Sequence, residues 1–166
     1  MAVKANLEID EDIRVYLEAT AAMEQRQSIE GRHYHGYHEL VLKEGFAFEL
    51  APFPADMVGG LLGHCFSNAF NLSMRNPELA YCEGFAVSMI PVLHAWCVTL
   101  DGRVVDPTWT PSNEVEGLAY FGVPLADDYV RRVALTTKKF GVLDRWEEGF
   151  PILSVSRETW LHEGWR

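Results

Sequence analysis

A β-hairpin centred on Asp101-Gly102 is the feature that most constrains the fold of this sequence. Residues 94–100 and 103–106 on either side are rich in β-branched and aromatic side chains, a composition typical of strands. An Asp-Gly pair between two such runs is a strong hairpin signal. We therefore expect an antiparallel pair of strands, and the length of the loop decides which side chains share a face of the sheet.

The loop length also decides whether His94 and Asp106 can meet. Side chains alternate between the two faces along a strand, so a plain two-residue turn would place Asp106 on the face opposite His94. A three-residue loop, with Gly102 left-handed as a bulge, would pair Trp96 with Asp106 and bring Asp106 to the face of His94. A bulge at Gly102 is therefore expected if these two side chains act together.

A cysteine precedes the hairpin at a predicted helix start. Three nearby glycines give the approach to Cys65 conformational freedom, and residues 64–74 show a helical pattern that ends at Asn-Pro. Backbone N–H groups at a helix start lack partners and favour a thiolate. A thiol nucleophile also needs a base and a group that orients the base. The sequence therefore predicts a catalytic triad of Cys65, His94 and Asp106.

The remaining patterns predict an α+β domain. Helical periodicity covers residues 8–30, 126–138 and 156–162, and a strand pattern covers residues 81–89. Residues 34–50 alternate as a strand or a hairpin would, and residues 107–124 are predicted as loop. The chain has 166 residues and no linker or internal repeat. We therefore expect a single domain over residues 1–166, with a catalytic core at about residues 55–110.

Four short motifs carry a resemblance to a known family. They are Gly-His-Cys at 63–65, Tyr-Cys-Glu-Gly at 81–84, His-Ala-Trp at 94–96 and Asp-Gly-Arg-Val-Val-Asp-Pro-Thr-Trp at 101–109. The chain resembles the transglutaminase-like cysteine superfamily, including bacterial and phage proteins and, loosely, lasso-peptide leader peptidases. The resemblance covers residues 60–109. It implies a transglutaminase-like or papain-like core, in which a nucleophile helix packs on an antiparallel sheet, and a reaction through a thioester.

The donors that would stabilise an oxyanion are less clearly marked. The sequence has no Gln a few residues before Cys65, where papain-like enzymes carry one. The Cys65 N–H is one candidate donor. The side chain of Asn68, one helical turn later, is a second candidate, although it could equally cap or pack the helix.

Glu83 and Trp96 complete the candidate site residues. Glu83 lies inside an apolar run, where a carboxylate needs a partner; it would either bind substrate or pair with Arg75 or Arg103. Trp96 would shield the pair of His94 and Asp106 from water, although a strand Trp is more often a core residue.

A zinc site is the competing interpretation of the cysteines. His64, Cys65, Cys82, His94 and Cys97 offer suitable ligand types, but no Cys-x-x-Cys pair is present. Cys82 and Cys97 are interpreted as buried apolar residues, and three neighbouring histidines, His33, His35 and His38, as surface residues. We therefore expect no metal and no cofactor.

Charge and hydropathy exclude several classes of partner. The chain has 14 Lys and Arg against 24 Asp and Glu, a net charge of −10, which repels nucleic acid and anionic membranes. The apolar runs are too short to span a bilayer, and the acidic N-terminus does not resemble a signal peptide. An odd number of cysteines argues against a disulfide framework. The sequence predicts a cytoplasmic protein.

Together these features predict a cysteine-nucleophile hydrolase of the peptidase or amidase type. Its substrate would be a peptide, a protein or a small amide, and the reaction would pass through a thioester. A transamidating acyltransferase would use the same three residues. A non-catalytic binding or inhibitory module and a small zinc-stabilised protein are two further candidate functions.

Overall fold

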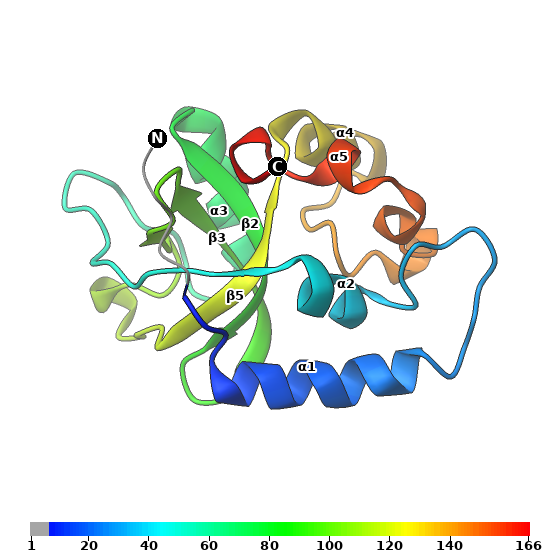
Figure 1. The fold of residues 1–166 in the computed structure, drawn as a ribbon. Helices are drawn as coiled ribbons and strands as arrows, with labels where there is room; N and C mark the ends of the chain where they lie inside the picture. Colours follow the sequence, from blue (N-terminus) through cyan, green and yellow to red (C-terminus); the bar gives the residue numbers. More distant parts are fainter. Residues whose placement is uncertain (1–6) are drawn as a thin grey trace.

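An antiparallel sheet forms the centre of the protein (Figure 1). The computed structural model describes residues 7–166. Within this range the strands lie in the spatial order β1-β5-β2-β3-β4. Their bounds are β1 Phe46–Ala47, β2 Leu79–Val87, β3 Pro91–Thr99, β4 Val104–Val105 and β5 Ala119–Leu125. Helices flank the sheet, so the predicted α+β class with an antiparallel sheet is confirmed.

The α-helices lie around this sheet, with α1 running along one end of the molecule beside α2 (Figure 1). Their bounds are α1 Glu11–Glu24, α2 Tyr37–Glu44, α3 Cys65–Arg75, α4 Asp127–Thr137 and α5 Arg157–Trp160. The helices predicted near residues 64–74, 126–138 and 156–162 are confirmed as α3, α4 and α5, and the first predicted helix is shorter than expected. Within residues 7–166, no helix combines the length and the apolar character that crossing a membrane requires.

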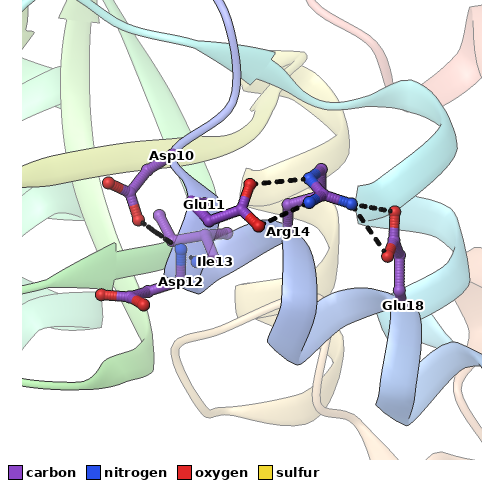
Figure 2. A network of polar contacts seen from close by, with 6 residues as sticks. All are labelled: Asp10, Glu11, Asp12, Ile13, Arg14 and Glu18. Atoms are coloured by element: carbon purple, nitrogen blue, oxygen red, sulfur yellow. Dashed lines mark hydrogen bonds and ion pairs between the residues drawn. The ribbon is translucent and has the colours of Figure 1, made fainter.

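The first helix is fixed at its start by its own side chains (Figure 2). The carboxylate of Asp10 accepts hydrogen bonds from two backbone N–H groups of the first turn, at 3.0 and 3.2 Å. Arg14 then bridges Glu11 and Glu18, one turn away on either side, at 2.6 and 2.9 Å. A side-chain cap satisfies N–H groups that a helix leaves unpaired. The cap formed by Asp10 therefore fixes the residue at which α1 begins.

The turn between β3 and β4 contains the expected bulge. Gly102 has a φ of 93°, and the N–H of Thr99 donates to the carbonyl of Arg103 at 2.9 Å across a three-residue loop. The register of β3 against β4 then places Asp106 on the same face of the sheet as His94. The prediction of a three-residue loop with a glycine bulge is confirmed.

Both faces of the sheet are covered by other parts of the chain. On one face the ring of Phe85 lies 5.3 Å from Tyr16 of α1 and 6.4 Å from Tyr37 of α2. On the other face Trp96 packs edge-on against Tyr120 of β5, with ring centroids 5.1 Å apart. Strand β2 between them is buried along its whole length. Apolar burial of this kind is the main stabilising contribution to the fold.

The prediction of a strand or hairpin at residues 34–50 is wrong for most of that segment. Residues 37–44 form α2, and of this segment only residues 46–47 belong to a named strand, β1. Tyr37, Leu40 and Val41 have the i, i+3, i+4 spacing of a helix face that packs inward. Glu39 and Lys43 add an ion pair one turn apart, at 2.6 Å. This helical spacing outweighs the alternation of apolar and polar residues.

The prediction of a loop throughout residues 107–124 is also wrong, because β5 begins at residue 119 and pairs with β2. Pro124 weakens the strand pattern, since proline cannot donate to a sheet ladder. In the structure the carbonyl of Pro124 points away from β2 and accepts from the N–H of His162 at 3.0 Å. The missing N–H of Pro124 points to the same side, so the pairing with β2 loses nothing.

Candidate active site

His94 and Asp106 form a buried hydrogen-bonded pair. Nε2 of His94 lies 2.7 Å from Oδ2 of Asp106, and each side chain is 3% exposed. His94 is on β3, and Asp106 follows β4 directly, so the bulged hairpin brings them together. A buried charged group needs a partner of this kind, and the pair is the centre of the candidate site.

Every oxygen of the Asp106 carboxylate is held in place. Oδ1 accepts from the backbone N–H groups of Thr108 at 2.8 Å and Trp109 at 3.1 Å. Oδ2 accepts from the hydroxyl of Tyr120 at 2.8 Å, in addition to its bond with His94. Tyr120 was not among the predicted site residues, because the strand that carries it was not predicted. The Asp-Pro-Thr-Trp motif, by contrast, is a recognisable turn that returns N–H groups to its own aspartate.

The imidazole of His94 is covered by Trp109. The two rings are nearly parallel, at 18°, with centroids 4.1 Å apart. Burial lowers the pKa of His94, but the side-chain interactions with Asp106 and Cys65 outweigh it and raise the pKa to about 9. A protonated imidazole is thus favoured at neutral pH, and the aromatic ring stacked on it also favours the cation.

Cys65 occupies the first position of α3, as predicted. Gly63, with a φ of 83°, turns the chain into the helix, and the first helical bond runs from the N–H of Asn68 to the carbonyl of His64 at 2.9 Å. The Cys65 thiol is partly exposed and interacts with the His94 side chain. Because Nε2 of His94 is used by Asp106, Nδ1 is the ring nitrogen that remains for this thiol.

Asn68 joins the loop before Cys65 to the turn after Asp106. Its Nδ2 donates to the carbonyl of Leu61 and to the hydroxyl of Thr108, both at 2.9 Å. Both N–H donors of the amide therefore have partners within the protein. The structure places Asn68 as a link between the two segments, and its role as an oxyanion donor stays a prediction.

A second side chain strengthens the same connection. Nδ2 of Asn113 donates to the carbonyl of Gly60 at 2.9 Å and to the carbonyl of Thr108 at 2.8 Å. The N–H of Gly60 donates in turn to the carbonyl of Pro107 at 2.6 Å. We call residues 60–68 and 106–113 with these bonds the loop clamp. It fixes the start of the cysteine helix relative to the aspartate turn.

Glu83 lies on the other face of the sheet and is fully buried. It accepts from the hydroxyl of Tyr81 at 2.7 Å and from the backbone N–H groups of Val142 and Leu143 at 2.7 and 2.9 Å. Burial raises the pKa of Glu83 despite these three donors. Arg145 contributes the opposite, lowering influence through its charge. The contacts of Glu83 anchor the segment after α4 rather than reaching the pair of His94 and Asp106.

Trp96 shares the face of His94 but is fully buried. Its ring centroid lies 6.2 Å from that of His94, against 4.1 Å for Trp109. Trp109 is therefore the closer cover of the imidazole. The indole N–H of Trp96 has no hydrogen-bond partner in the described part of the chain, which fits a packing position in the core.

Cys82, Cys97, His35 and His38 lie apart from the candidate site. Cys82 and Cys97 are fully buried, and burial raises the pKa of both thiols. His35 and His38 bond to Glu39 and Glu24 at 2.8 and 2.6 Å. Within residues 7–166, no three His, Cys, Asp or Glu side chains gather where they could hold a metal ion. No three of the side chains named as zinc ligands therefore come together within the described residues.

Comparisons of the chain with protein-family models, with curated proteins and with solved structures find no match. The resemblance to the transglutaminase-like superfamily therefore rests on the sequence motifs themselves.

Proposed function

We propose that this protein is a cysteine-nucleophile hydrolase of the peptidase or amidase type, on a transglutaminase-like or papain-like core. One observation carries the proposal: His94 is fixed by Asp106 through Nε2, which leaves Nδ1 for the thiol of Cys65 at a helix start. Nucleophile, base and orienting group thus stand in the order that triad chemistry requires.

In the proposed reaction the sulfur of Cys65 attacks the carbonyl carbon of an amide, and its proton resides on His94. The backbone N–H of Cys65, at the start of α3, is the donor nearest the developing oxyanion. Collapse of the tetrahedral intermediate breaks the C–N bond, and His94 gives its proton to the departing amine. A thioester on Cys65 remains.

Hydrolysis then regenerates the thiolate. A water molecule gives a proton to His94 while its oxygen attacks the thioester carbonyl. The C–S bond breaks, the acid product leaves, and the proton stays on His94, as at the start of the cycle. Throughout, Asp106 orients the imidazole, and its three further donors keep the carboxylate from rotating.

The proposal is tested by alkylation of Cys65 with iodoacetamide at graded pH, followed by peptide mapping. Burial protects Cys82 and Cys97 from the reagent whether or not His94 is present, so these two thiols do not test the proposal. The informative comparison is the alkylation rate of Cys65 in His94→Ala against that in His64→Ala. Both variants lose an imidazole close to Cys65, but His64 is exposed and caps the helix through its backbone.

We expect His94→Ala to slow alkylation of Cys65 at pH 6 by about tenfold or more, because the thiolate loses its paired cation. His64→Ala should stay within about twofold of wild type. Equal rates in wild type and His94→Ala would overturn the proposal. A screen of peptide amides with release of the amine as readout then tests turnover itself, with Cys65→Ala as the inactive control.

A further inference from the structure

A cleft of about 690 Å³ adjoins the candidate active site. Asp106, Trp109 and Tyr120 form the part of its wall that it shares with the pair of His94 and Asp106. Its volume lies in the range of pockets that hold a small molecule or a side chain of a peptide. A group bound there would contact the ring that covers His94.

The wall of the cleft is apolar and aromatic with an acidic rim. Leu50, Pro52, Phe53, Val104 and Val115 line it together with Trp109 and Tyr120. Glu114 and Glu116 also line the cleft, and no Lys, Arg or His is among the lining residues. The site therefore combines apolar surface with negative charge and has no cation of its own.

The two rim carboxylates are available to a ligand. Glu114 and Glu116 are exposed, whereas the carboxylate of Asp106 already accepts from His94, Tyr120 and two backbone N–H groups. Within the described chain, neither glutamate forms an ion pair with the protein. A ligand cation would thus meet two carboxylates without displacing an existing bond.

The aromatic rings favour the same kind of ligand. Trp109 and Tyr120 lie 6.1 Å apart at 56°, and both line the cleft. A cation near such rings is attracted by their π faces, and an aliphatic chain packs on the apolar wall. Lysine and arginine side chains carry both features in one group.

We propose that this cleft binds a cationic aliphatic side chain, that of Lys or Arg, at the end of the candidate site that Asp106 and Trp109 form. The inference rests on the proposed function for its place in a peptide substrate, but the binding itself does not require chemistry. It assigns the protein a preference for basic peptides, in agreement with its net charge of −10.

The test separates binding from turnover by using Cys65→Ala protein, labelled with ¹⁵N for NMR. The two probes are N-acetyl-L-lysine methylamide and N-acetyl-L-norleucine methylamide, which differ in the ammonium group. We expect the lysine probe to shift the resonances of Trp109, Val115 and Gly117 and to bind about three- to tenfold more tightly than the norleucine probe. Equal affinities would overturn the charge preference, and shifts confined to other residues would overturn the site.

Matched variants identify the groups responsible. The double variant with Glu114→Gln and Glu116→Gln should bind the lysine probe only as tightly as the norleucine probe. Its affinity for the norleucine probe should be unchanged. The pair Glu30→Gln and Glu78→Gln removes the same charge from exposed positions outside the cleft and should change neither. An equal loss in both double variants would show an effect of net charge only and refute the cleft as the site. Loss of His94-dependent alkylation, by contrast, would refute the proposed function and leave the binding result standing.

Discussion

His94 and Asp106 meet at 2.7 Å although each side chain is only 3% exposed. The pair is therefore held almost entirely out of water, where the interaction between charges is strong and the loss of either partner is costly. The surrounding hydrogen bonds and the Trp109 ring keep both groups in one orientation.

This burial predicts that stability depends on pH. The pKa of His94 is raised from 6.5 to about 9, so the pair stabilises the folded state fully below pH 6.5. The contribution, of roughly 3 kcal/mol, is lost as the pH rises from 6.5 through 9. Urea unfolding at pH 6, 7.5 and 9 should show this fall in the free energy of unfolding. Asp106→Asn should largely remove the slope, and an unchanged slope would contradict the assignment to His94.

A second prediction concerns the hydroxyl of Tyr120. Tyr120→Phe removes one donor from Asp106 and should lower the free energy of unfolding by about 2 kcal/mol. The remaining carboxylate charge then acts more fully on the imidazole, so the pKa of His94 should rise above its wild-type value in an NMR titration. Tyr81→Phe is the matched control, because it removes a tyrosine donor from the buried Glu83. It should destabilise by a similar amount and leave His94 unchanged.

The register set by the bulge at Gly102 predicts an effect of strand length. Deletion of Val104 keeps the three-residue loop but would pair Asp106 with Cys97 instead of Trp96. Asp106 should then move to the opposite face, and alkylation of Cys65 should become independent of His94. Gly102→Ala keeps the loop length and costs about 1–2 kcal/mol through its φ of 93° alone, since no atom lies within 4 Å of the added methyl group. Retained dependence on His94 after the deletion would contradict this register.

Gly84 pairs with both His94 and Gly122. We expect a side chain at this position to destabilise the fold. A Cβ atom there would clash with the carbonyl oxygen of Phe121 and with the Cα of Gly122. Strand β5 would have to shift, so Gly84→Ala should cost about 1–3 kcal/mol. Thermal unfolding measures the loss. Gly31→Ala is a control in open space, where only the positive φ opposes the substitution. A Gly84→Ala variant as stable as wild type would contradict this close approach.

The parts of the site that depend on residues close together in the sequence could be predicted, and the parts that depend on distant residues could not. The start of α3 at Cys65 and the hairpin around Gly102 depend on neighbouring residues, so both could be predicted. Tyr120 could not, because Gly122 and Pro124 obscure its strand, and the direction in which Pro124 points depends on His162. Trp96 is the residue that the sequence predicts as the cover of His94. Trp109 lies closer to the His94 ring than Trp96 does, because of the path that the chain takes after Asp106.

The loop clamp has a consequence for how such a site could be transplanted or recombined. Asn68 and Asn113 each bond across to the other segment, so neither segment carries the geometry of the site alone. A chimaera that exchanges residues 60–68 without residues 106–113 would combine interlocking parts from different sources and misplace the thiol. Grafting both segments together transfers all the bonds of the loop clamp. Exchange with a related protein should therefore preserve the site only when residues 60–68 and 106–113 are exchanged together.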